Sequence, residues 1–156
     1  MRLFSLLCLC EDGMEYQKVR YLMYLIQLTG VDLKYKFRYG YNGFTCEQLS
    51  SFIDDCINKG YLIEKDDKLY SKKDISDEIT SADYVDLLNY IKGVGSSLSL
   101  QSLNYIATVG IIVETDKSYN RDKVLKSINL LTNNEYTDED FNEAMRVINT
   151  CRKQFK

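Results

Sequence analysis

The sequence predicts a mainly α-helical fold with a small β element, in which strand, helix and hairpin follow one another as in a winged helix. Three observations support this. Apolar residues recur at three- and four-residue spacing over much of the 156-residue chain, as in helices that bury one face. Strand patterns occupy only two short segments, 34–41 and 61–71. Hydrophobic residues make up 45% of the chain, enough for one core. We expect a winged-helix-like lobe (1–75) and a helical lobe (76–156) packed as one compact unit.

Two buried helices are expected at the start of the chain. The first runs from about Arg2 to Cys10 and ends near Gly13, which suits a left-handed cap. It lacks a signal-peptide cleavage site and is too short to span a bilayer, so we expect no membrane association. The second starts close to Glu15 and ends at Gly30. Apolar residues cover most of its circumference, which is typical of a central core helix.

Cationic and aromatic residues alternate between Leu33 and Phe44, before a turn that contains Asn42-Gly43. A period of two places the cations on one face of a strand and the aromatic residues on the other. We predict a partner-binding surface here, because Tyr and Arg are enriched at interface hot spots. The alternative is that Tyr35, Phe37 and Tyr39 only form the buried face of the strand. The proposed electrostatic contacts are Lys34, Lys36 and Arg38, and the proposed anchors are Tyr39, Tyr41 and Phe44.

An amphipathic helix and a hairpin are expected next. Thr45 and Gln48 have the spacing of a capping box, which predicts a helix that ends at Lys59 before Gly60. Segments 61–64 and 69–71 flank an Asp-rich turn and are expected to pair as a hairpin. Strand, helix and hairpin in this order resemble a winged-helix unit, with the hairpin as the wing.

The second half of the chain is expected to be helical, after a polar connector from Lys72 to Ser81. One helix covers Ala82 to Lys92 and is broken by the glycine-rich run 93–97. This run lacks the lysine and the preceding strand of a phosphate-binding loop, which favours a plain turn between helices. A second helix covers about 100–111, a third is capped by Asn120, and the last begins at Thr137 with three acids in its first turn.

Composition argues against the familiar catalytic mechanisms. The chain has no histidine, which removes the usual general base and the commonest transition-metal ligand. Its five cysteines show no Cys-x-x-Cys spacing, so we expect reduced, buried thiols in a cytoplasmic protein. A carboxylate nuclease that uses Asp54, Asp55, Asp66 and Asp67 around a hard cation is a third hypothesis, but such acids are usually a solvated face. We therefore expect no enzyme activity, no cofactor and no metal.

Several motifs are similar to a known family. Segments 22–27, 35–45 and 59–63 within the run from Tyr21 to Ile63 resemble the YwgA-like family of small bacterial proteins and, more distantly, the Panacea antitoxin domain. Segments 103–108, 119–124 and 136–140 also fit the family pattern, although its turn usually carries Gly-Pro where this chain has Asn42-Gly43. The resemblance implies a mostly helical fold with a winged-helix-like element and a toxin–antitoxin, phage or defence context. It supplies no catalytic residue.

Two functions from different classes follow. The first is a non-enzymatic, protein-binding regulator that is either antitoxin-like or an adaptor associated with phage or defence. Its partner would be a toxin, an effector or another regulator. A homodimer is also left open. The alternative is a winged-helix DNA-binding transcriptional regulator that reads DNA with helix 45–59. Nucleic acid is disfavoured as a partner because the net charge is −3 and phosphates require cations. The acids Glu47, Asp54, Asp55, Asp66 and Asp67 would also face the DNA.

Overall fold

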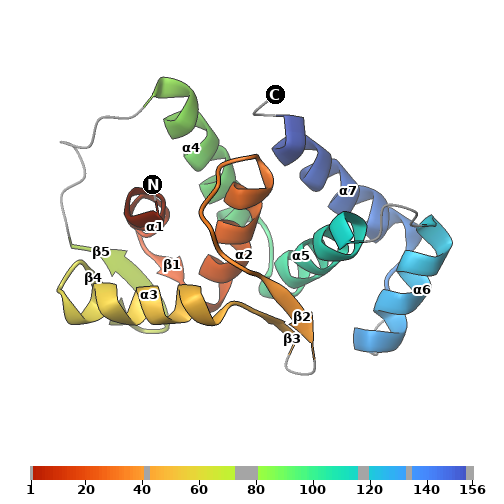
Figure 1. The fold of residues 1–156 in the computed structure, drawn as a ribbon, viewed down its shortest axis with the longest axis horizontal. Coiled ribbons are helices and arrows are strands. Elements are labelled where there is room, and N and C mark those ends of the chain that lie inside the picture. Colours follow the sequence, from red (N-terminus) through yellow and green to blue (C-terminus); the bar gives the residue numbers. More distant parts are fainter. Residues whose placement is uncertain (1, 41–42, 73–80, 116–119, 133–134, 154–156) are drawn as a thin grey trace.

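The computed structural model describes residues 2–40, 43–72, 81–115, 120–132 and 135–153. Within these ranges the fold is mainly helical with a small antiparallel β element, as the sequence predicts (Figure 1). The elements in chain order are α1 (Arg2–Leu9), β1 (Met14–Glu15), α2 (Tyr16–Leu28), β2 (Arg38–Gly40), β3 (Gly43–Thr45), α3 (Glu47–Asn58), β4 (Leu62–Lys65), β5 (Lys68–Ser71), α4 (Ala82–Ser97), α5 (Leu100–Thr115), α6 (Arg121–Thr132) and α7 (Asp138–Lys153).

The strands between α1 and α4 include a three-stranded antiparallel sheet that contacts α1 and α3. Strand β1 pairs antiparallel with β5, and β5 pairs antiparallel with β4, so the sheet order is β1-β5-β4. Asp66 and Asp67 form the tip of the β4–β5 hairpin with φ of 53° and 63°, the left-handed values of a two-residue hairpin turn whose twist matches the strands. The predicted hairpin is therefore confirmed, whereas the two-residue strand β1 was not predicted. The β2–β3 hairpin is inserted between α2 and α3.

Helix α2 is the centre of the fold, as its apolar circumference predicts. It packs against α1, α4, α5 and α7, and Figure 1 shows it between the sheet side of the molecule and the C-terminal helices. Val19, Leu22, Met23 and Ile26 are completely buried. The hydrophobic core is one continuous cluster that includes residues from both halves of the chain, so the predicted lobes 1–75 and 76–156 share this core.

The predicted helix break at residues 93–97 is wrong, because α4 continues to Ser97. Gly95 lies against α2, where a Cβ atom would come within 2.6 Å of Leu22 Cδ1. The Nζ atom of the buried Lys18 donates a hydrogen bond of 3.0 Å to the Gly95 carbonyl, which lies in the last helical turn, where carbonyls lack helical partners. The glycine therefore serves the close packing of two helices.

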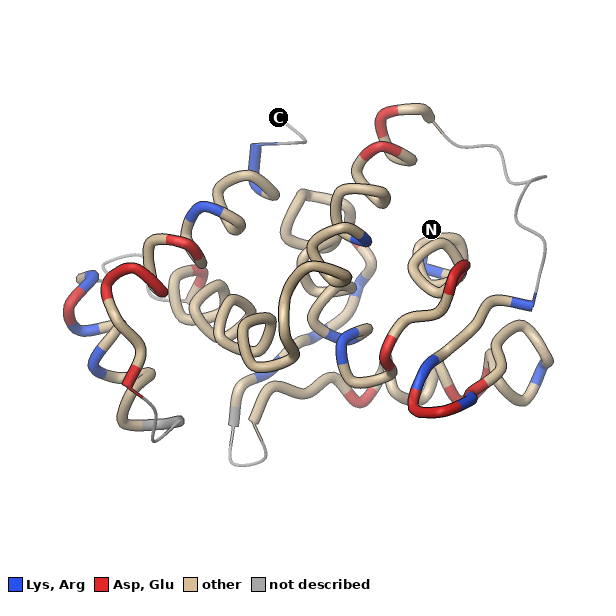
Figure 2. The backbone as a smooth tube through the Cα atoms, turned by 180° about the vertical axis from the view of Figure 1, so that it is seen from behind, with Lys and Arg blue, Asp and Glu red and all other residues tan. Residues whose placement is uncertain are grey.

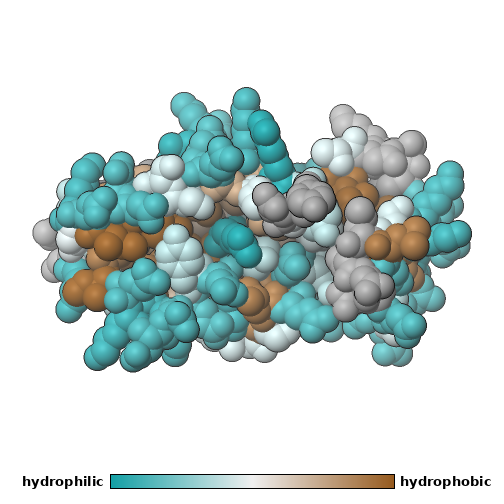
Figure 3. Space-filling model, turned by 90° about the horizontal axis from the view of Figure 1, so that it is seen from below, coloured by the Kyte–Doolittle hydropathy of each residue, from teal (hydrophilic) through white to brown (hydrophobic). Residues whose placement is uncertain are grey.

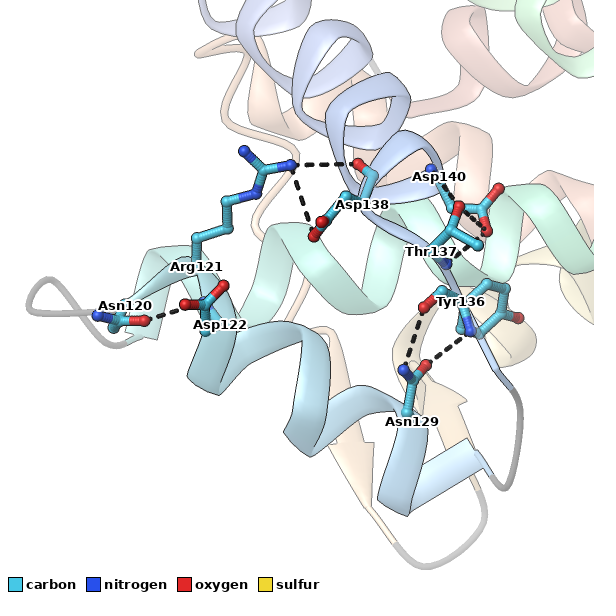
Figure 4. A network of polar contacts seen from close by, with 8 residues as sticks. All are labelled: Asn120, Arg121, Asp122, Asn129, Tyr136, Thr137, Asp138 and Asp140. Atoms are coloured by element: carbon cyan, nitrogen blue, oxygen red, sulfur yellow. Dashed lines mark hydrogen bonds and ion pairs between the residues drawn. The ribbon is translucent and has the colours of Figure 1, made fainter.

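Side-chain hydrogen bonds cap the starts of α6 and α7 and tie the connection between them to α6 (Figure 4). Asn120 Oδ1 accepts a hydrogen bond of 2.9 Å from the Asp122 amide, which confirms the predicted cap of α6. Thr137 Oγ1 accepts from the Asp140 amide, and Asp140 Oδ2 accepts from the Thr137 amide at 2.8 Å, a reciprocal cap that confirms the predicted start of α7. Asn129 of α6 bonds both backbone groups of Tyr136, so the segment that leads into α7 is tied to α6.

None of the helices in the described ranges is both long enough and apolar enough to cross a membrane. The predicted connector falls mostly on residues 73–80, which lie outside the described residues.

Candidate functional site

The alternating segment runs along the surface between α2 and α3. Leu33 and Tyr35 are only 1% and 4% exposed, whereas the intervening cations and Arg38 are exposed. The predicted separation of cationic and aromatic faces is therefore confirmed for residues 33–38. The predicted strand is confirmed only from Arg38 to Gly40, where β2 pairs with β3 in the register Arg38↔Thr45. Lys34 has φ of 59°, a left-handed conformation that does not fit a strand.

Side chains from two helices replace the missing strand partner. Gln27 of α2 accepts a hydrogen bond of 3.1 Å from the Tyr35 amide and donates one of 2.9 Å to the Tyr35 carbonyl. Gln48 of α3 accepts a bond of 3.0 Å from the Lys36 amide. The predicted capping box of α3 is consequently wrong: its N-cap is Cys46, without a side-chain cap bond. The Gln48 side chain fixes the neighbouring segment instead of its own helix end.

Arg2 of α1 provides the third attachment. Its guanidinium donates to the Leu33 carbonyl and, at 2.9 Å, to the Lys34 carbonyl. The Arg2 Cζ atom also lies 4.3 Å from the centre of the Tyr35 ring, in cation–π geometry. Segment 33–36 is thus held by α1, α2 and α3 together.

The aromatic side of the segment joins a ring cluster on α2. Phe44 is 2% exposed, and its ring centre lies 5.3 Å from those of Tyr21 and Tyr24 and 5.5 Å from that of Phe37. The prediction of Phe44 as a surface anchor is therefore wrong, because its ring is packed in the core. Tyr39 is partly buried against the same core. Tyr41 lies outside the described residues.

We call Lys34, Lys36 and Arg38 the cationic edge. No ion pair joins any of the three to a carboxylate within the described ranges. Lys36 and Arg38 border a hollow of about 280 Å³ that also touches the start of α3, where Glu47 is its one acid. Figure 2 shows the Lys and Arg positions on the chain that leads into the β2–β3 hairpin. The cationic edge can therefore accept carboxylates from a partner.

Helix α3 and the tip of the β4–β5 hairpin carry the opposite charge. Glu47, Asp54 and Asp55 are exposed on α3, and Asp66 and Asp67 are exposed at the hairpin tip, where Figure 2 shows red flanked by blue. A hollow of about 490 Å³ beside this tip is also lined by Glu15 and Glu64. Among the residues that the structure describes, no three His, Cys, Asp or Glu side chains are placed to hold a metal ion.

Cys10 and Cys151 offer no reactive thiolate near neutral pH. All five are free and buried. Burial raises the pKa of Cys10 and of Cys151 to about 12, and a protonated thiol is a poor nucleophile.

The face seen from below in Figure 3 is mostly hydrophilic, with separate hydrophobic patches. Within the described ranges, the large apolar side chains that are exposed are Ile63 (42%) and Leu130 (75%), one on each half of the chain. A contact with a partner through the cationic edge would therefore depend on charge more than on apolar area.

Sequence reasoning did not find the three residues that hold the segment. Arg2, Gln27 and Gln48 lie far from one another in the sequence; Arg2 and Gln27 belong to no local motif, and the capping-box spacing of Gln48 predicted a different role. No family model matches the chain, and neither a curated protein nor a solved structure shows significant similarity to it. The resemblance to the YwgA-like family and to the Panacea domain stays a prediction.

Proposed function

We propose that this protein is a non-enzymatic, protein-binding regulator, antitoxin-like or an adaptor in phage defence, which binds an acidic partner surface through its cationic edge. One observation carries the proposal. The three cations are exposed and form no ion pair with any described residue. Their backbone is attached to three helices by Arg2, Gln27 and Gln48. A segment that is already ordered loses less conformational entropy when it binds.

The charges indicate the chemistry of the partner. Lys34, Lys36 and Arg38 lie within five residues, and one acid, Glu47, borders the adjoining hollow. Complementary charge across an interface speeds encounter and excludes wrong partners. An acidic segment of another protein, with carboxylates that reach Lys36 and Arg38, satisfies these requirements. Tyr39, which is partly exposed beside Arg38, would contribute apolar contact area.

DNA binding through the winged-helix-like unit is the second candidate, and the order of its elements is the observation that favours it. The exposed acids of α3 and of the hairpin tip oppose it, because DNA affinity comes chiefly from cations on phosphates. Lys59, Lys65, Lys68 and Lys72 are exposed cations that could offset them, and a fifth, Lys73, lies outside the described residues. We therefore rank DNA below an acidic protein.

The experiment compares two charge-reversed variants with the native protein as affinity baits in lysate from the host. The test variant carries Lys34→Glu, Lys36→Glu and Arg38→Glu. The control variant carries Lys123→Glu, Lys126→Glu and Lys153→Glu, three exposed cations on α6 and α7 that give the same change in net charge. Captured proteins are identified by mass spectrometry, and the purified partner is then titrated against each bait at several salt concentrations. A DNA mobility-shift assay at low salt runs in parallel.

The proposal expects a partner that the native and control baits capture and the test variant loses, with affinity that falls as salt rises. Capture that survives reversal of the cationic edge would reject the mechanism. Duplex DNA that is bound with a steep salt dependence, and is lost in the test variant, would establish the DNA alternative.

A further inference from the structure

A small pocket lies between α5 and α7, away from the cationic edge. It has a volume of about 50 Å³, room for only a few water-sized groups. Ser102, Tyr105 and Ile106 of α5 and Asp140, Glu143 and Ala144 of α7 line it, together with Leu98 and Tyr136. On each helix the three residues have the spacing i, i+3 and i+4, so they share one face.

Tyr105 is the unusual member of this pocket. Its side chain is only 4% exposed, yet its buried hydroxyl has no hydrogen-bond partner among the described residues. The ring is held by stacking on Tyr136, with ring centres 3.9 Å apart. Burial and the charges of Asp140 and Asp138 raise the pKa of Tyr105 to about 12, so the hydroxyl keeps its proton at neutral pH. A buried hydroxyl without a partner is costly, and a bound polar group would remove that cost.

The carboxylates at the pocket have free acceptor capacity. Asp140 uses Oδ2 to cap α7, while its Oδ1 accepts no hydrogen bond from the residues that the structure describes. Glu143 faces Arg146 at 3.6 Å in an exposed pair, and such pairs contribute little. Acids in the first turn of a helix stabilise that helix end, which accounts for the position of Asp138 and Glu139 in α7. It does not account for the unpaired hydroxyl of Tyr105.

We propose that this pocket binds the primary ammonium group of an alkyl chain, either a lysine side chain or a free alkylamine. An ammonium has three donors, and the residues that line the pocket include three with groups that can accept them: the Tyr105 hydroxyl and the carboxylates of Asp140 and Glu143. Leu98, Ile106 and Ala144 give the last methylene groups an apolar wall. The pocket shares Leu98 and Glu143 with a groove of about 560 Å³ between α4 and α7, into which the rest of the chain can extend. The planar guanidinium of an arginine is larger and suits the small pocket less.

Butylammonium is the first probe, titrated into the full-length ¹⁵N-labelled protein and followed by amide chemical shifts. n-Butanol is the neutral control. Tyr105→Phe removes only the unpaired hydroxyl, and Glu143→Gln removes one charge. The matched controls are Tyr35→Phe, which removes another unpaired buried hydroxyl, and Glu139→Gln, which removes an exposed acid of α7 that does not line the pocket. Thermal unfolding of every variant is recorded.

The proposal expects butylammonium to shift the amides around residues 102–106 and 140–144 and n-butanol to leave them unchanged. Tyr105→Phe should weaken binding by roughly tenfold or more, as for a lost bond to a charged group, while the melting temperature stays the same or rises. Glu143→Gln should weaken binding, and neither control variant should. The two sources are then compared with 1,4-diaminobutane and with a lysine pentapeptide beside its norleucine version; the tighter binder identifies the source.

Three outcomes would overturn the proposal: no shifts with butylammonium at up to about a hundredfold molar excess, equal binding of n-butanol, or equal weakening by Tyr105→Phe and Tyr35→Phe. A lower melting temperature for Tyr105→Phe, with butylammonium binding unchanged, would assign the hydroxyl a structural role instead. None of these results affects the cationic edge, which lies on other elements.

Discussion

Replacing Gln27 by Met tests whether the cationic edge is held in place by α2. The Gln27 side chain makes two hydrogen bonds to the backbone of Tyr35, of 2.9 and 3.1 Å. Met has a similar length and helix propensity, so the substitution removes the bonds and keeps the helix. Each bond contributes about 1 kcal/mol, and an amide or carbonyl left buried without a partner costs about 1–3 kcal/mol. Apolar packing of the half-buried Met offsets part of this, which leaves an expected loss of about 2–3 kcal/mol.

The free energy of unfolding is measured by urea denaturation followed by circular dichroism, and hydrogen exchange reports on the Tyr35 amide. For a chain of this size the loss corresponds to a melting temperature lower by roughly 4–12 °C. The Tyr35 amide should also exchange faster. Gln17→Met, at an exposed position of the same helix, is the control and should change stability by less than about 0.5 kcal/mol. Equal stability of the two variants, with unchanged exchange at Tyr35, would refute the reasoning.

Two further predictions concern the core. Gly93→Ala and Gly95→Ala gain the same helix propensity on α4, but a Cβ at Gly93 meets nothing within 4 Å, whereas one at Gly95 comes within 2.6 Å of Leu22. Urea denaturation should therefore show that the Gly93→Ala variant is more stable than the Gly95→Ala variant by about 1–3 kcal/mol. Equal stabilities would contradict the packing of α4 on α2. The free energy of unfolding should also fall as pH rises from about 9 to 12, by about 1.4 kcal/mol per pH unit for each thiol. The reason is that Cys10 and Cys151 keep their protons in the folded state, whereas the unfolded chain releases them. Denaturation at each pH measures this free energy, and a value that does not change with pH would contradict the burial of the two thiols.

The helices and the β4–β5 hairpin were predictable because their signals are local. The apolar stripe of α3, the caps at Asn120 and Thr137 and the Asp-rich hairpin turn depend on residues a few positions apart. The predicted break near Gly93 failed because the packing of α4 on α2, through Gly95, outweighs the low helix propensity of glycine.

The candidate site was predictable only in part. Alternation correctly gave the outward cations, since it depends on neighbouring residues. It could not show that the Phe44 ring would pack against tyrosine rings of α2. Nor could it show that Gln48 would accept a hydrogen bond from the Lys36 amide instead of capping α3. Those outcomes depend on contacts between segments that are distant in the sequence, such as Arg2 with Lys34. The pocket at Tyr105 likewise exists only once α5 and α7 are packed.

Photo-crosslinking in the host tests the central claim, binding of an acidic protein at the cationic edge, most directly. p-Benzoylphenylalanine replaces Tyr39, beside Arg38 on β2, and in a control it replaces Tyr61 near the start of β4. We predict a discrete protein adduct from position 39 that is absent from position 61, is lost when Lys34, Lys36 and Arg38 are reversed to Glu, and maps to an acidic segment of the partner. No adduct at position 39, or one that persists after charge reversal, would contradict the account.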